Sequence, residues 1–123
     1  MFEIEKTFSF EAGHTLTQHD GKCKSPHGHS YIFKVAIRKN VLIPSGPKQG
    51  MVMDFHDMSA KVKPMIEKYF DHAWLNDTLE TDTPTAEFIA EWIFKYLEKN
   101  LPGLYRVTVY ETATSSASYS RIS

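Results

Sequence analysis

The chain has 123 residues, of which 41% are apolar and 24% are charged, and its net charge is −1. This composition is typical of a globular protein, and the length predicts one domain over residues 1–123. Lys and Arg (14) balance Asp and Glu (15), which argues against a nucleic-acid or membrane partner. No apolar run reaches the roughly 18 residues of a transmembrane helix.

Two strands are predicted in the first third of the chain. Residues 2–12 alternate between apolar and polar side chains, with Lys6 as the one exception. Residues 29–38 alternate again and carry Tyr31 and Phe33 on the apolar side. Such alternation is typical of half-buried strands, and the two can pair as a hairpin.

Two helices are predicted next, after a connection over residues 40–50 that is rich in Pro and Gly. Asp54 resembles an N-cap, and the apolar residues between 58 and 69 follow helical spacing. Pro64 lies inside this run and should kink or interrupt it. Thr83-Pro84 is interpreted as the N-cap and first residue of the second helix.

The last two predicted elements are strands at about 104–112 and 117–122. The order β-β-α-α-β-β predicts an α+β fold, in which a four-stranded antiparallel sheet carries two helices on one face. No glycine-rich phosphate loop opens either helix, which excludes the Rossmann and P-loop classes.

One Cys and six His stand out in the composition. A single Cys cannot form an internal disulfide, and the acidic, alternating N-terminus is unlike a signal peptide. We therefore expect a cytoplasmic protein that keeps a free thiol.

Three of the histidines fall on apolar strand faces. His14 continues the apolar face of the first strand, and His27 and His29 continue that of the second strand backwards. In an antiparallel hairpin these three imidazoles can converge on the buried side of the sheet. Three His ligands with an open fourth position are typical of a catalytic zinc site, so Zn²⁺ is the favoured ion. Hydrogen-bonded loop histidines are the alternative, with about equal weight on the spacing alone.

The only thiol lies in the loop between these histidines. Cys23 precedes His27 by four positions. Beside a metal ion, its pKa would fall and it could serve as a base or nucleophile. A small, partly buried thiol without a task is the alternative.

Six stretches of the chain resemble the family of 6-pyruvoyl- and 6-carboxytetrahydropterin synthases. They occur in the family's order and are FSFEAGH (8–14), CKSPHGHSY (23–31), GMVMDF (50–55), DHAWLN (71–76), PTAE (84–87) and YET (110–112). The resemblance implies the tunnelling fold, in which three subunits close their sheets into a barrel. It therefore implies a homo-oligomer, either a trimer or a hexamer made of two trimers, with active sites between subunits.

The resemblance also assigns functions to individual residues. It makes His14, His27 and His29 the zinc ligands, and Cys23 the catalytic thiol. It implies that Asp71 and His72 are the catalytic acid–base pair and that Glu111 is a catalytic residue that also anchors the pterin. Thr85 is implied only as a pterin-binding residue, and an ordinary first-turn helix residue is the alternative. The sequence pattern is compatible with a pterin-binding function of Glu111, because Glu111 continues the apolar face formed by Val107 and Val109.

The spacing of the thiol distinguishes branches of the family. Three residues separate Cys23 from His27, which resembles the bacterial 6-carboxytetrahydropterin synthases of queuosine precursor synthesis. The implied reaction converts 7,8-dihydroneopterin triphosphate to 6-carboxytetrahydropterin, acetaldehyde and triphosphate. The first alternative is a 6-pyruvoyltetrahydropterin synthase. An alternative of another class is a non-catalytic zinc-binding assembly module.

Overall fold

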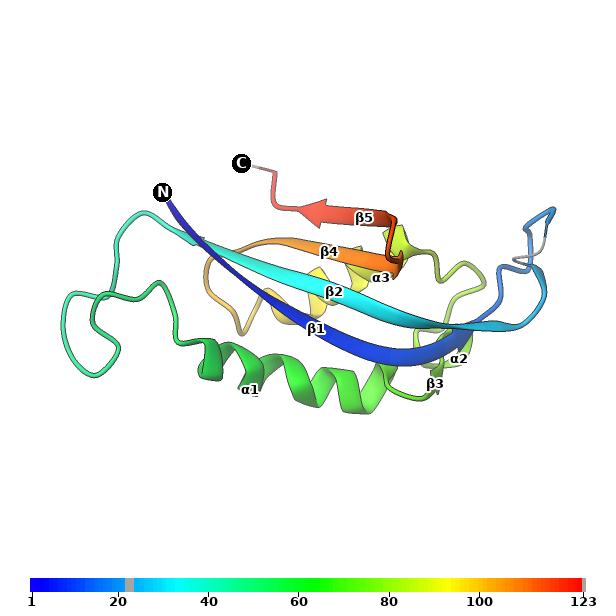
Figure 1. Cartoon of the computed structure of the whole chain (residues 1–123), viewed down its shortest axis with the longest axis horizontal. Helices are drawn as coiled ribbons and strands as arrows, with labels where there is room; N and C mark the ends of the chain where they lie inside the picture. Colours follow the sequence, from blue (N-terminus) through cyan, green and yellow to red (C-terminus); the bar gives the residue numbers. More distant parts are fainter. Residues whose placement is uncertain (22–23, 123) are drawn as a thin grey trace.

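A long antiparallel hairpin forms the frame of the structure. The computed structural model describes residues 1–21 and 24–122. Strand β1 (Phe2–His14) pairs along its whole length with β2 (His27–Lys39). Strand β4 (Leu104–Thr112) pairs with β2, and β5 (Ser115–Ser120) pairs with β4, both antiparallel. Figure 1 shows the strands curving together across the molecule, with both chain termini far from the β1–β2 turn.

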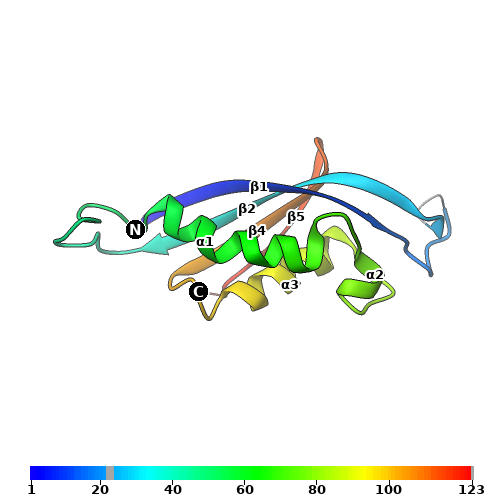
Figure 2. The same cartoon turned by 90° about the horizontal axis from the view of Figure 1, so that it is seen from below.

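The helices cover one face of this sheet. Helix α1 (Phe55–Met65) and helix α3 (Ala86–Leu97) run beneath it, and the short α2 (Leu75–Thr78) lies toward the β1–β2 turn (Figure 2). This α+β arrangement agrees with the predicted class and with the predicted order of the longer elements.

The predicted number of strands and helices was wrong. A two-residue strand, β3 (Ala73–Trp74), adds to the edge of the sheet and runs parallel to β1, giving the order β3-β1-β2-β4-β5. Among the described residues, the sheet is therefore mixed and five-stranded, and α2 is a third α-helix. Elements of two and four residues are too short to show a periodicity, and β3 exists only because β1 offers it a partner.

The structure confirms one of the two predicted helix starts and corrects the other. Asp54 is the N-cap of α1, as predicted, and its carboxylate accepts a hydrogen bond from the His56 N–H at 2.7 Å. The prediction of Thr83 as the second N-cap was wrong. The cap is Thr85, whose hydroxyl accepts from the Phe88 N–H at 3.1 Å. Pro84 therefore precedes the cap, and both threonines offered equivalent capping chemistry in the sequence.

Helical geometry changes directly after Pro64. The α-helical residues end at Met65, and a π-helical turn follows over Ile66–Phe70. This turn ends where the Asp71 N–H donates to the Ile66 carbonyl at 2.8 Å. The wider turn delivers the chain to the edge of β1, where Asp71 and His72 lie.

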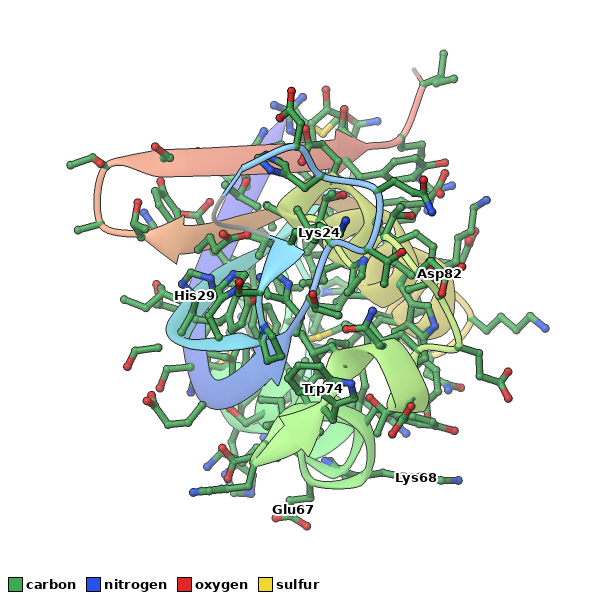
Figure 3. All side chains as sticks on the ribbon, turned by 90° about the vertical axis from the view of Figure 1, so that its right-hand side faces the viewer. Lys24, His29, Glu67, Lys68, Trp74 and Asp82 are labelled. Atoms are coloured by element: carbon green, nitrogen blue, oxygen red, sulfur yellow. The ribbon has the colours of Figure 1, made fainter. Side chains whose placement is uncertain are left out.

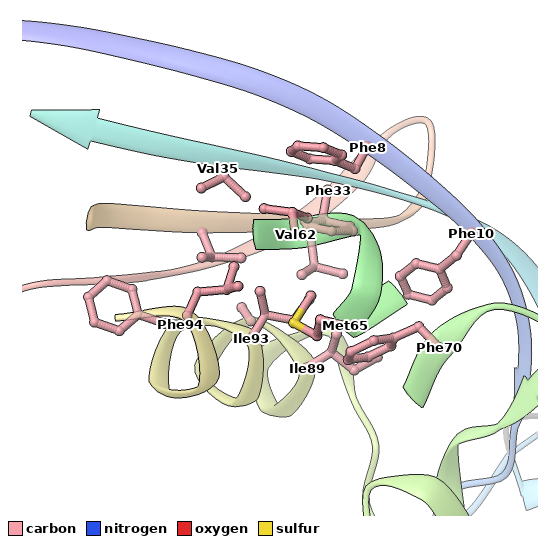
Figure 4. Close-up of a cluster of buried hydrophobic side chains, with 14 of the residues drawn as sticks. Phe8, Phe10, Phe33, Val35, Val62, Met65, Phe70, Ile89, Ile93 and Phe94 are labelled. Carbon is pink, nitrogen blue, oxygen red and sulfur yellow. The ribbon is translucent and has the colours of Figure 1, made fainter. Parts of the chain in front are cut away.

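Apolar side chains from the sheet and the helices form one core (Figure 4). Aromatic rings line its sheet side, with Phe10 stacked on Tyr31 at 4.9 Å and Phe8 stacked on Phe33 at 5.4 Å between ring centroids. The helices contribute mainly aliphatic side chains, among them Met58, Val62, Met65, Ile89 and Ile93. This packing fixes the faces of β1 and β2, and so decides where the residues at the end of the hairpin point.

Candidate metal centre and active site

Three imidazole rings meet at the closed end of the β1–β2 hairpin. His14 stands opposite His27 in the register, and Ala12 stands opposite His29. The ring centroids lie 4.5 to 5.1 Å apart, and the rings meet edge to face. Figure 3 looks onto this end of the molecule and labels His29. The core-facing side of the hairpin thus brings together the three residues that the strand periodicity placed there.

Backbone carbonyls fix the orientation of two of these rings. His14 Nδ1 donates to the Pro84 carbonyl at 2.9 Å, and His27 Nδ1 donates to the Ser25 carbonyl at 2.7 Å. Because a carbonyl oxygen can only accept, each Nδ1 carries the hydrogen. In the neutral rings, both Nε2 atoms then present lone pairs, and these two atoms are 2.8 Å apart. Two facing lone pairs need a cation between them, either a proton or a metal ion.

Burial disfavours the protonated form of two of these rings. His14 is fully buried, and this burial holds its pKa below the ordinary value, although the Pro84 carbonyl and Glu111 act in the other direction. Burial likewise lowers the pKa of His29. Neutral imidazoles with free Nε2 lone pairs are the form in which histidine binds metal ions.

A carboxylate completes the group. Glu111 Oε1 lies 3.2 Å from His29 Nε2, and that nitrogen is buried without a hydrogen-bond partner among the described residues. One ligand atom each from His14, His27, His29 and Glu111 can be chosen so that all four lie within 4.8 Å of one another. Three imidazole nitrogens and one oxygen fit a first-row metal ion such as zinc.

Two buried groups contact the Nδ1 atom of His14, on the side of the ring away from Nε2. The Tyr31 hydroxyl lies 3.2 Å from His14 Nδ1, on the same side as the Pro84 carbonyl. Burial, with a smaller effect of Glu111, raises the pKa of Tyr31, so its hydroxyl stays protonated. Metal-binding histidines commonly have such partners on the second ring nitrogen. The sequence offered no sign of either partner, because Tyr31 resembles an ordinary core aromatic and Pro84 acts through its backbone.

Asn76 clamps the residue that follows His14. Its side-chain carbonyl accepts from the Thr15 N–H, and its amide group donates to the Thr15 carbonyl, both at 2.9 Å. The side chain therefore ties β1 to this segment two positions beyond the last β1–β3 pair, Gly13 and Trp74. In the sequence, Asn76 lies within the stretch DHAWLN but was assigned no function, since a single Asn carries no periodic signal.

Asp71 and His72 are anchored on β1 rather than in the four-residue group. Asp71 accepts the Glu11 N–H at 3.1 Å, and the His72 N–H donates to the Glu11 carbonyl. This Glu11 N–H is the main reason why the pKa of Asp71 lies below its ordinary value, and His72 contributes. The other Asp71 oxygen is 3.0 Å from His72 Nδ1, so the carboxylate orients the ring.

His72 lines an open hollow together with His29, which is one member of the four-residue group. The hollow is lined by His29 and Ser30 of β2, residues 11–13 of β1, and His72 and Ala73. The His72 side chain is 80% exposed. The structure thus places His72 beside the group, where a molecule in the hollow can touch both His72 and His29.

The remaining predicted residues lie in different places. Cys23 lies outside the described residues. Thr85 caps α3, one residue after the carbonyl that holds His14. His19 and His56, for which no function was predicted, are exposed.

Sequence comparison relates this chain to one family of known proteins. The sequence profile of the 6-pyruvoyl tetrahydropterin synthase family matches residues 3–121. A Synechocystis protein named 6-carboxy-5,6,7,8-tetrahydropterin synthase is 47% identical over 120 residues, covering 97% of this chain and 93% of its own. A Haemophilus influenzae protein of the same name is 36% identical, covering 97% and 99%.

A solved structure gives the same result for the fold. The 6-pyruvoyl tetrahydropterin synthase of Caenorhabditis elegans superimposes with a TM-score of 0.83 at 29% identity, covering 98% of this chain and 95% of its own. In the described part of the chain, no helix has the length and apolar character needed to cross a bilayer. Together, the sequence profile, the relatives and the superposition show that this chain belongs to the 6-pyruvoyl tetrahydropterin synthase family.

Proposed function

We propose that this protein is a zinc-dependent lyase that converts 7,8-dihydroneopterin triphosphate to 6-carboxytetrahydropterin, releasing acetaldehyde and triphosphate. The observation that carries the proposal is the similarity, over nearly the whole length, to proteins named 6-carboxy-5,6,7,8-tetrahydropterin synthase. The group of three imidazoles at the end of the β1–β2 hairpin supports it independently.

The proposed metal ligands are His14, His27 and His29. Their geometry supports this assignment because two Nε2 atoms face each other at 2.8 Å while both Nδ1 hydrogens are bound to carbonyls. Zinc bound by these residues would supply a Lewis acid for the side-chain hydroxyls of the substrate.

Proton transfer is assigned to two side chains. The Cys23 thiolate takes a proton from the substrate side chain, and His72 moves a second proton at the ring or side chain. Asp71 holds His72 Nδ1 at 3.0 Å, so the other ring nitrogen points away from Asp71 and is free to exchange a proton. The tie between Asp71 and the Glu11 N–H keeps this pair fixed on β1.

Glu111 and Thr85 are assigned to the pterin ring. A pterin presents an amino group and a ring N–H side by side, and one carboxylate can accept both hydrogens. Glu111 would thereby fix the ring so that its side chain meets the zinc and Cys23. The Thr85 hydroxyl accepts from the Phe88 N–H as a cap, which leaves its own hydrogen available for a pterin.

The proposed assembly is a trimer, or a hexamer of two trimers, in which the sheets join into a barrel. The sheet is open, with β5 at one edge and the two-residue β3 at the other. Pairing between subunits would satisfy the free backbone groups of these edges. The exposure of His72 fits an active site that is completed between subunits.

The central experiment incubates zinc-loaded protein with 7,8-dihydroneopterin triphosphate and assays acetaldehyde and the pterin product. Acetaldehyde with 6-carboxytetrahydropterin supports the proposal. A pyruvoyl product without acetaldehyde would select the alternative, a 6-pyruvoyltetrahydropterin synthase, which the likeness to the Caenorhabditis elegans enzyme favours. No turnover of any kind would refute the assignment as an enzyme of this substrate.

Two variants test which residues bind zinc and which take part only in catalysis. Cys23→Ala should retain zinc and lose turnover, whereas loss of zinc would favour the non-catalytic zinc-binding module. His27→Ala should lose zinc, and His56→Ala is its matched control because His56 is exposed and outside the group. Full zinc content in His27→Ala would refute the ligand assignment.

A further inference from the structure

The Glu111 carboxylate is directed at the imidazole nitrogens. Its Oε1 lies 3.2 Å from His29 Nε2, a buried nitrogen without a hydrogen-bond partner among the described residues. Glu111 is not among the residues that line the open hollow beside the site. In this position the carboxylate faces the imidazole group and not the open hollow.

Two pairs of atoms in the group are spaced like ligand atoms of one zinc ion. With metal–ligand bonds of about 2.05 Å, the ligand atoms of a tetrahedral zinc site lie about 3.3 Å apart. The His14–His27 nitrogen pair is at 2.8 Å and the His29–Glu111 pair is at 3.2 Å. Both pairs are thus close to this spacing, and all four atoms lie within 4.8 Å of one another.

A local irregularity of the sheet gives Glu111 this position. Tyr110 pairs with Ser116 and Thr112 pairs with Ser115, so Glu111 is the extra residue of a bulge between β4 and β5. Bulges redirect side chains, and they occur often next to active sites. The pairing of β4 with β2 also ends before Glu111, at Tyr110. The side chain is still 27% exposed, which leaves it room to move.

We propose that Glu111 is the fourth ligand of the resting metal centre and leaves the metal when a pterin binds. The second half rests on the proposed function, in which Glu111 anchors the pterin. The amino group of a pterin and its side chain lie at opposite ends of the ring system. One carboxylate therefore cannot hold the amino end while it occupies the metal position that the side-chain hydroxyls require. Substrate binding exchanges one metal–oxygen bond for another and transfers Glu111 from the metal to the ring.

Metal affinity without any pterin tests the first half. Zinc affinity is measured by competition with a chromophoric chelator for the wild type, Glu111→Gln and Glu111→Asp. Loss of partners around a metal site typically weakens binding about 10- to 100-fold, and we expect at least the lower figure for both variants. Glu111→Asp keeps the charge but shortens the reach, so it separates coordination from long-range attraction.

The matched control is Glu11→Gln. The Glu11 carboxylate lies on the neighbouring strand β1, where it accepts from the Ser30 hydroxyl at 2.6 Å, outside the four-residue group. Its zinc affinity should equal that of the wild type. Zinc affinity of Glu111→Gln within twofold of the wild type would overturn the ligand assignment. Wild-type zinc affinity of Glu111→Asp would also overturn it, because the negative charge alone would then explain the contribution of Glu111.

Cobalt spectroscopy tests the release. The Co²⁺-loaded wild type is titrated with 2-amino-4-hydroxypteridine, which has the recognition edge of a pterin but no side chain to bind the metal. Its visible absorption should change toward that of pterin-free Co²⁺-loaded Glu111→Gln. An unchanged spectrum at saturating pteridine, or no pteridine binding by fluorescence, would overturn the exchange.

The outcomes separate this inference from the proposed function. Weaker zinc binding in Glu111→Gln together with no turnover by the wild type would refute the function and leave the ligand in place. Turnover by the wild type together with unchanged zinc binding in Glu111→Gln would support the function and refute Glu111 as a metal ligand.

Discussion

Removing the Asn76 side chain should loosen the end of β1 at which the four-residue group lies. Asn76→Ala deletes two hydrogen bonds of 2.9 Å to the backbone of Thr15. Thr15 is half-buried, so water partly replaces them, and each bond contributes a net of about 1 kcal/mol. We expect the free energy of unfolding to fall by about 2 kcal/mol. With an m-value of about 2 kcal/mol/M, the urea midpoint should fall by about 1 M.

The assay is urea unfolding of metal-free protein, followed by circular dichroism at one fixed protein concentration. Asn100→Ala is the matched control, because Asn100 is exposed beyond the end of α3. It should unfold within about 0.5 kcal/mol of the wild type, as surface substitutions usually do. If Asn76→Ala unfolded at the same urea concentration as Asn100→Ala, the two hydrogen bonds of Asn76 would contribute nothing to stability and the argument from their geometry would be wrong.

Three other predictions concern the core, pH and metal. Phe33→Ala removes a fully buried ring stacked on Phe8 and should cost about 3–5 kcal/mol in urea unfolding. The pKa of Asp71 lies below its ordinary value of 3.8, so its stabilising contribution is complete above that pH and is lost as the pH falls through the lower, folded pKa. The pH dependence of urea unfolding below pH 4 should therefore be shallower in Asp71→Asn than in the wild type, and identical slopes would contradict this. Zinc at 100 times its dissociation constant should stabilise the fold by about 2.7 kcal/mol, which chelation by EDTA should reverse in thermal unfolding; a melting temperature insensitive to both would contradict a site in the folded protein.

The sequence predicted the hairpin well because its signal is local and repeated. Alternation over 2–12 and 29–38 located both strands and their buried faces, and extending those faces placed His14, His27 and His29 on one side. Strand β3 and helix α2 escaped prediction, since two or four residues have no period and depend on contacts with distant β1.

Other parts of the site depend on backbone atoms and turns that side-chain patterns do not encode. The π-helical turn and the left-handed backbone of His72 (φ 57°) bring Asp71 and His72 to Glu11. Before the structure, only the family resemblance pointed to this pair. The bulge at Glu111 likewise arises from the pairing register of β4 and β5, which the sequence does not reveal.

Because the histidines lie at the closed end of the hairpin, a metal ion bound there would also affect the stability of the fold. His14 and His27 are 13 positions apart in the chain, so an ion held by both closes a loop. Such a cross-link removes conformations from the unfolded chain, and a disulfide across a loop of about 15 residues contributes about 3 kcal/mol in this way. This chain has a single Cys and cannot form an internal disulfide, so the bound ion would act as a cross-link in its place. Amide hydrogen exchange at the last pairs of β1 and β2 would then slow on metal binding, because local fraying would first have to break this cross-link.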